Sequence, residues 1–166
     1  MTGFFSVKRL APLALLVLLA AGAVAAQAQE RFKLSADGQE VLDTTSNLLW
    51  RRCPEGMQWD GKVCKGKPTK YSFAAAKKYT AAAAKDSAKA WHVPTKEELL
   101  SIVIKGKKKP MTDLKAFPNT PSAPFWSLRT GFDDNLNAWA INFGNGHVYG
   151  NSGEAKFHLR LVRANS

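Results

Sequence analysis

Hydrophobic and polar positions alternate near the start of the chain in a pattern typical of short antiparallel strands. Arg31–Leu34 alternates, Asp37-Gly38 is a hairpin signal, and the alternation resumes over Glu40–Asp43. Thr44–Asn47 forms a second polar turn before Leu48-Leu49-Trp50. The opening therefore predicts strand, turn, strand.

Two later stretches carry helical signals. Tyr71–Ala90 is rich in Ala, the best helix former, and Ser72 can cap its start. We expect Tyr79 to lie on the apolar side of this helix. A second helix begins at Thr95, because Thr95-Lys96-Glu97-Glu98 matches a capping box, and Leu99, Leu100, Ile102 and Val103 supply its apolar face.

From Pro110 onward the pattern becomes a series of loops and short strands. Strands are expected at Phe125–Leu128, Trp139–Phe143, His147–Tyr149 and Phe157–Val162. In the last of these, Phe157, Leu159 and Leu161 share one face, which leaves His158 as an expected surface residue. Two helices followed by short strands, without strand–helix–strand alternation, predict an α+β domain with a mainly antiparallel sheet.

The first 28 residues have the pattern of a secretory signal peptide. Lys8 and Arg9 supply the positive region, an uncharged apolar stretch follows, and Ala26-Gln27-Ala28 fits a cleavage site. The alternative is an uncleaved membrane anchor, for which the stretch is short and very rich in Ala. We therefore expect residues 1–28 to be removed, leaving 29–166 as a single domain in the periplasm or outside the cell, with no later membrane span.

Cys53 and Cys64 are the only cysteines of the 166-residue chain. In an oxidising compartment such a pair is expected to bridge, and Pro54, Gly56 and Gly61 allow the intervening loop to fold back. The alternative, a metal or redox site, lacks a C-x-x-C motif and a second cysteine pair. We expect a structural disulfide that fixes this loop, with Trp59 packed inside it.

Charge is concentrated in one third of the chain. The whole chain carries +11, or +9 without Lys8 and Arg9, and the window from Lys62 to Lys115 alone carries 14 Lys, no Arg and 4 acidic residues. Like charges this dense repel one another, so an anionic partner would relieve that repulsion. The alternative is a solvated face that keeps the protein soluble. The candidate ligand-binding residues are Lys62, Lys65, Lys67, Lys70, Lys105, Lys107, Lys108 and Lys109.

Signals for catalysis or metal binding are few. The chain has no P-loop, dinucleotide fingerprint, G-x-S-x-G or H-E-x-x-H motif, and His92, His147 and His158 are scattered. Asp133-Asp134-Asn135 could offer oxygen ligands to calcium, but lacks the regular spacing of such sites, so a polar loop tip is expected. Glu97 and Glu98 could be paired catalytic carboxylates, but adjacent helical residues do not face each other. We predict no enzyme, no cofactor and no metal.

A series of ordered motifs resembles a known bacterial family. The motifs are Val41–Trp50, Cys53 with Cys64, Trp91–Leu99, Phe117–Pro121, Phe125–Ser127, Ala138–Phe143 and Arg160–Arg163. Together they resemble the exported domain named after the C-terminal domain of the Legionella collagen-like adhesin (Lcl), over roughly Phe32 to Arg163.

This resemblance implies a fold related to C-type lectin-like domains, no known catalysis, and recognition of glycosaminoglycans as in the adhesin. The sequence departs from the family in having His92 where the family's Trp-Arg-Leu-Pro-Thr motif has Arg. No collagen repeat precedes the domain, so trimeric display does not carry over. Trp139 is followed by Ala140 rather than Asn-Asp, so the resemblance does not imply calcium-dependent sugar binding.

The leading hypothesis is an exported, non-enzymatic, lectin-like domain that binds an acidic or sulfated polysaccharide, or another polyanion, through its lysine loops. Lys rather than Arg favours point-charge attraction over bidentate recognition. Anionic lipid headgroups fit the same chemistry, and nucleic acid is not expected after export. The alternatives are an envelope structural or interaction module that docks an acidic protein, and an enzyme built on a lectin-like fold.

Overall fold

The computed structural model describes residues 1, 3, 30–128 and 138–165. Its described part combines two helices with three antiparallel sheets, as the α+β prediction requires. The polar loop tip expected at Asp133-Asp134-Asn135 and the cleavage site expected after Ala28 lie outside the described residues. The elements follow in the order β1 Phe32–Leu34, β2 Glu40–Asp43, β3 Leu48–Arg51, β4 Met57–Trp59, β5 Cys64–Gly66, α1 Phe73–Ser87, α2 Lys96–Ser101, β6 Pro124–Leu128, β7 Ala138–Asn142, β8 Val148–Asn151 and β9 Val162–Ala164.

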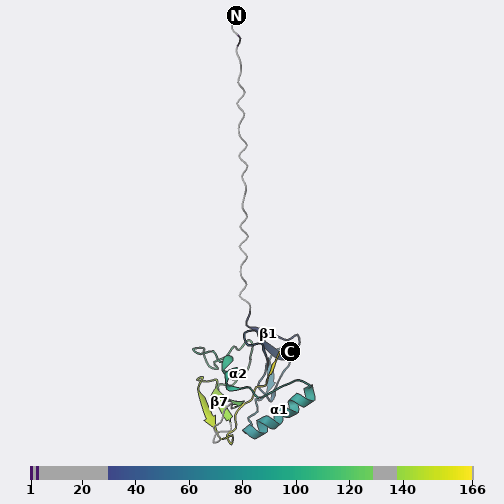
Figure 1. Cartoon of the computed structure of the whole chain (residues 1–166), viewed down its shortest axis with the longest axis vertical. Coiled ribbons are helices and arrows are strands. Elements are labelled where there is room, and N and C mark those ends of the chain that lie inside the picture. Colours follow the sequence, from purple (N-terminus) through teal and green to yellow (C-terminus); the bar gives the residue numbers. More distant parts are fainter. Residues whose placement is uncertain (2, 4–29, 129–137, 166) are drawn as a thin grey trace.

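The first sheet joins the two ends of the domain. Its strand order is β1-β2-β3-β9, so the last described strand pairs with β3, with Trp50 opposite Val162. The β4–β5 hairpin forms a second sheet, and β6-β7-β8 form a third. Figure 1 shows α1 and α2 on different sides of the domain, with α2 near β7.

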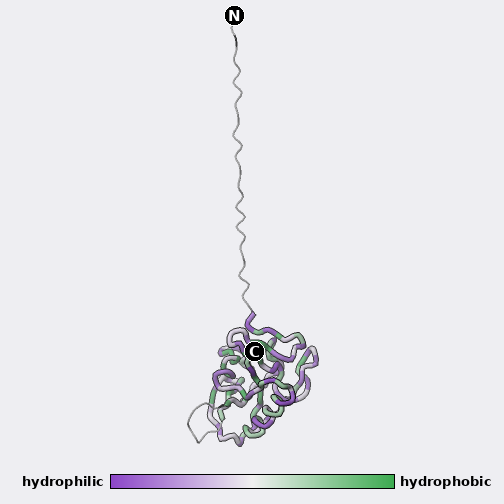
Figure 2. Tube along the Cα trace, turned by 45° about the vertical axis from the view of Figure 1, so that its right-hand side comes forward, coloured by the Kyte–Doolittle hydropathy of each residue, from purple (hydrophilic) through white to green (hydrophobic). Residues whose placement is uncertain are grey.

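Two hydrophobic clusters hold these layers together, and Figure 2 shows the hydropathy of the chain along its trace. In the first, α2 packs against the third sheet, and Leu99 of α2 and Ile102 directly after it belong to a cluster that also contains Trp50, Phe117 and Phe125. In the second, Phe73 and Ala76 of α1 lie among Trp91, Trp126, Leu159 and Leu161. The aromatic side chains therefore form the core, as their burial preference predicts.

Local signals located both helices well. Ser72 caps α1 and accepts a hydrogen bond from the Ala75 N–H, and the capping box at Thr95 is complete. However, α1 is shorter than the expected Tyr71–Ala90. Tyr71 pairs instead with Phe157 in a β-bridge, and Ala88 ends the helix in a left-handed conformation with φ 50°.

The expected terminal strand Phe157–Val162 is wrong in extent. Regular pairing covers only β9, whereas Phe157 and His158 each form an isolated bridge to a different segment. Alternation of faces therefore does not hold here, and His158 is not the surface residue that was expected. It is buried at 5% exposure, with its ring against Phe125 and Nδ1 3.3 Å from the Thr69 carbonyl oxygen.

The disulfide between Cys53 and Cys64 is formed, as expected, with the Cα atoms 5.6 Å apart. Most of the enclosed loop is the β4–β5 hairpin, in which Trp59 is paired opposite Cys64. Trp59 is not packed inside the loop. It is partly exposed, and the Arg52 guanidinium lies 3.6 Å from its ring centroid.

Gly56 allows the loop to approach the segment that follows it. Its φ is +91°, and a Cβ atom there would lie 2.2 Å from Thr69 Oγ1 and 2.7 Å from the Thr69 backbone nitrogen. In the same place the Thr69 N–H donates to the Glu55 carbonyl at 2.9 Å. Only glycine accommodates both this backbone conformation and this contact.

Candidate anion-binding surface

The first group of candidate lysines lies on and after the β4–β5 hairpin. Lys62, Lys65, Lys67 and Lys70 are all exposed. Lys65 forms an ion pair with Asp60 at 2.9 Å, and Asp60 also accepts hydrogen bonds from the N–H groups of Lys62 and Val63. These donors lower the pKa of Asp60 well below its ordinary value. Asp60 therefore fixes the hairpin turn, while the lysine side chains extend into solvent.

The second group occupies the connection between α2 and β6. Lys105, Lys107, Lys108 and Lys109 are exposed on a tight loop, in which the Lys107 N–H donates to the Ile104 carbonyl and Gly106 has φ 80°. The only ion pair that this group makes with a described residue joins Lys107 Nζ to Asp113, at 3.9 Å. Both sequence-predicted groups are thus surface groups, on separate segments, and no described contact joins them.

A buried charge cluster, missed by the sequence analysis, lies beneath the start of the disulfide loop. Arg160 is fully buried and donates to the carbonyl oxygens of Arg51 and Arg52 and, at 2.7 Å, to Thr120 Oγ1. Burial lowers the pKa of Arg160 to about 9. Its guanidinium also lies over the Phe117 ring, 4.9 Å from the centroid. Arg160 therefore ties the chain around Arg51 and Arg52 to the C-terminal segment.

Glu55 is the acidic member of this cluster. It is 3% exposed, accepts a 2.7 Å hydrogen bond from the Tyr79 hydroxyl, and lies 3.6 Å from Arg51. Desolvation raises the pKa of Glu55, opposed by the positive charges of Arg51 and Arg160. The expected apolar role of Tyr79 is therefore incomplete, because its ring packs against the second core cluster while its hydroxyl serves Glu55. The Arg160–Arg163 motif was the one sequence signal that pointed to this region.

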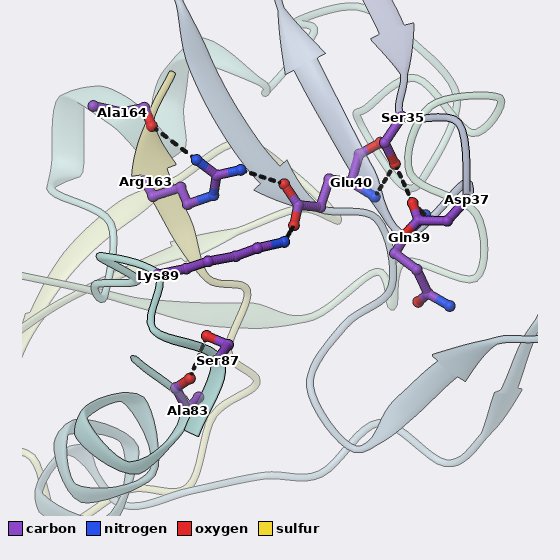
Figure 3. Close-up of polar contacts among 9 residues, drawn as sticks. All are labelled: Ser35, Asp37, Gln39, Glu40, Ala83, Ser87, Lys89, Arg163 and Ala164. Carbon is purple, nitrogen blue, oxygen red and sulfur yellow. Dashed lines mark hydrogen bonds and ion pairs between the residues drawn. The ribbon is translucent and has the colours of Figure 1, made fainter. Parts of the chain in front are cut away.

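A second acidic residue, Glu40, joins three parts of the chain (Figure 3). Its carboxylate accepts hydrogen bonds from Lys89, which follows α1, and from Arg163 of β9, the latter at 2.7 Å. These partners lower the pKa of Glu40 against the opposing effect of burial. In the adjacent β1–β2 turn, Asp37 accepts from the Ser35 hydroxyl and the Gln39 N–H. The carboxylate of Glu40 is therefore paired within the fold, where it neutralises the charge of Lys89.

His92 pairs with Glu98 at the start of α2. The His92 Nε2 atom lies 3.1 Å from Glu98 Oε2, and the same oxygen accepts from the Thr95 N–H. The Glu98 carboxylate raises the pKa of His92, and His92 and the Thr95 N–H lower that of Glu98. Glu98 is thus committed to capping the helix, and this supports its structural interpretation.

We expect this pair to make stability depend on pH. Because the pKa of His92 is raised on folding, its contribution is full below the unfolded value of about 6.5 and is lost as the pH rises through the folded pKa. His92→Gln should remove this dependence, at a cost below about 1 kcal/mol because the pair is partly exposed. Urea unfolding of both proteins at pH 6 and pH 8.5 checks it.

His92→Arg is the matched control for that experiment. An arginine keeps its charge across this range, so its difference from the His92→Gln variant should be the same at both pH values. If wild type and His92→Gln instead differ equally at pH 6 and pH 8.5, the His92–Glu98 charge pair contributes nothing that titrates.

The described residues offer little for metal chemistry. Within the ranges 30–128 and 138–165, no group of three or more His, Cys, Asp or Glu side chains could hold a metal ion. Glu97 forms an ion pair with Lys96 at 3.2 Å. The carboxylate of Glu98 instead accepts from the Thr95 N–H and pairs with His92. The two carboxylates are therefore engaged by different partners.

Together, the fold and surface define a disulfide-bonded α+β domain with lysines displayed on two exposed segments. The chain belongs to the Lcl C-terminal domain family, whose model matches residues 39–163. This confirms the resemblance based on the ordered sequence motifs. No curated protein and no solved structure matches the chain.

The disulfide also bears on location. A bridge between the only two cysteines indicates an oxidising compartment outside the cytoplasm. Of the helices in the described residues, neither is long and apolar enough to cross a membrane.

Proposed function

We propose that this protein is an exported, non-enzymatic domain of lectin-like type that binds an acidic or sulfated polysaccharide through its two lysine groups. The observation that carries the proposal is the availability of the charges. All eight candidate lysines are exposed, and only Lys65 and Lys107 form ion pairs with described residues. The other six lysines are positioned to meet a polyanion without first breaking an ion pair to a described residue.

The chemistry of the lysines favours a long polyanion that is bound by charge, without recognition of its individual groups. Lysine ammonium groups act as mobile point charges, whereas bidentate recognition of individual sulfates favours arginine. The arginines of the domain support this division, because Arg31, Arg160 and Arg163 are engaged in internal hydrogen bonds. A flexible polysaccharide could contact one or both lysine groups, since repeated weak contacts along one chain add avidity.

The test compares retention on immobilised heparin with retention on a plain cation exchanger of matched charge density. Removing the loop lysines in the quadruple variant K105Q/K107Q/K108Q/K109Q should weaken heparin binding by about tenfold or more and flatten its salt dependence. Exposed charge pairs contribute up to about 1 kcal/mol each, and 1.4 kcal/mol is a factor of ten. The variant K62Q/K65Q/K67Q/K70Q tests the hairpin group in the same way.

A control variant separates placement from net charge. Lys77, Lys78, Lys85 and Lys156 are also exposed, and their joint replacement with Gln removes the same four charges. We expect this control to retain most of its heparin affinity. Equal weakening in all three variants, or equal retention of wild type on both columns, would mean that the charge acts diffusely. A stoichiometric acidic protein recovered from envelope extracts would then favour the protein-docking alternative.

A further inference from the structure

Arg51 lies where three hollows of the surface meet. One extends from Arg51 to Gln58 and Trp59 of the hairpin, one to Tyr79 and Asp86 of α1, and one to Lys89 and Trp91. Gln39 and Ser87 are each shared by two of these hollows. Their volumes are about 320, 320 and 200 Å³. We call this continuous depression the Arg51 groove.

The Arg51 groove has a different chemistry from the lysine segments. Its charged lining residues are three acids, Asp37, Glu40 and Asp86, and two bases, Arg51 and Lys89. Glu40 is already neutralised by Lys89 and Arg163. The groove therefore offers no surplus of positive charge, and a polyanion gains nothing from entering it.

The guanidinium of Arg51 is positioned by Trp91 and Glu55 and makes no hydrogen bond to another described residue. It lies over the ring of the buried Trp91, 5.2 Å from the centroid, and 3.6 Å from Glu55. That separation is too long for a hydrogen bond, so within the described part of the chain the N–H groups of Arg51 have no acceptor, and its side chain is 34% exposed. Such a fixed set of donors, in contact with solvent, loses little entropy when a ligand binds.

Glu55 supports this arrangement from below. Its Oε2 atom faces Arg51 and accepts from the Tyr79 hydroxyl, and both of these partners line the groove. Its Oε1 atom is buried with no hydrogen-bond partner among the described residues. Glu55 is thus a positioning residue, because it holds Arg51 and Tyr79, which line the groove, and does not line the groove itself.

Trp59 supplies the apolar surface at the hairpin end. The Arg52 guanidinium lies 3.6 Å from its ring centroid, and Trp59 is partly exposed and lines the groove. Gln39 and Gln58 lie beside it, and the Gln39 side chain donates to the Trp59 carbonyl at 3.2 Å. An aromatic ring flanked by amides and a guanidinium suits a ligand that has both C–H faces and hydroxyl groups.

From these observations we propose that the Arg51 groove binds a neutral carbohydrate chain. The Trp59 ring packs against the C–H face of one sugar, Arg51 and the two glutamines bond its hydroxyl groups, and the chain continues past Ser87 along α1. This proposal does not depend on the lysine segments, because the groove is separate from them in chemistry and in lining residues.

The test uses the protein exported from cells that express the full chain, on an array of neutral oligosaccharides of glucose, N-acetylglucosamine, mannose and galactose. Binding is measured in about 0.5 M NaCl, where charge attraction to polyanions is strongly screened. We expect at least one neutral oligosaccharide to be retained. Ala82→Trp, which fills the groove at α1, should weaken that binding at least tenfold, and Gln58→Trp should do so from the hairpin end.

Ala81→Trp is the matched control, since Ala81 is exposed on the same helix but does not line the groove. It should bind as wild type does, and equal melting temperatures of the two helix variants confirm that both are folded. The proposal is overturned if no neutral oligosaccharide is retained, or if Ala82→Trp and Ala81→Trp bind equally. Heparin retention at low salt, measured separately, reports on the lysine segments and is unaffected by either result.

Discussion

Replacing Arg160 with Met is expected to lower the free energy of unfolding by about 3–5 kcal/mol, the cost typical of removing one member of a buried charged cluster. Arg160 is fully buried and donates to two backbone carbonyls and to Thr120. The Met side chain fills similar space but makes none of these bonds. It also leaves Glu55 without one of the two positive charges that favour its ionised form.

The measurement is urea unfolding of wild type and Arg160→Met, with Glu55→Gln and the double variant completing a cycle. We expect the double variant to lose less than the two single variants together, because Gln removes the charge that Arg160→Met leaves uncompensated. Lys156→Met is the control, since Lys156 is exposed close by in the chain and should change stability by less than about 0.5 kcal/mol. A loss below about 1 kcal/mol for Arg160→Met would show that the cluster is dispensable for folding.

Sequence patterns predicted the elements whose signals are local. The caps at Ser72 and Thr95 are short-range hydrogen-bonding arrangements, and both lie where the sequence placed them. The strands around the Asp37-Gly38 turn, and those at Phe125–Leu128 and Trp139–Phe143, follow within a residue or two for the same reason. In these segments the local preference and the tertiary packing agree.

The segment Phe157–Leu161 shows the limit of prediction from local sequence patterns. Alternation predicted one buried and one exposed face, but His158 and Arg160 are buried as well as Leu159 and Leu161. Burial of these polar side chains depends on partners that are distant in sequence, such as Thr69 for His158 and Thr120 for Arg160. No periodicity within the segment can report such contacts.

The two candidate sites differ in the same way, because one is visible in the local sequence and the other forms only on folding. Lysine-rich segments are visible in sequence because exposed charge needs no partner, and the structure leaves all eight residues exposed. The Arg51 groove draws its lining from the β1–β2 turn, β3, the hairpin and α1. Single residues such as Gln39, Ser87 and Trp59 carry no motif, so their convergence appears only once the chain is folded.

Loss of the disulfide is expected to be the other large effect, about 3 kcal/mol in the free energy of unfolding. The bridge closes a loop with a sequence separation of 11, and most of its contribution is the restriction of the unfolded chain. Both cysteines are buried, so the variant C53A/C64A avoids the cost of burying hydroxyl groups. Urea unfolding of this variant, and of wild type in reducing agent, should give the same loss.

The position of the disulfide also predicts which part of the domain is destabilised when the bridge is lost. Cys53 lines the Arg51 groove, and the bridge holds β5 beside the chain that carries Glu55. Hydrogen bonds from Glu55 N–H to Leu159 and from Thr69 N–H to Glu55 hold this region independently, so the reduced protein should still fold. We expect amide exchange to rise first in β4 and β5 and to change little in α2. Uniform exchange across both regions would instead mean that the bridge stabilises the domain as one unit, with no special role in fixing the hairpin wall of the groove.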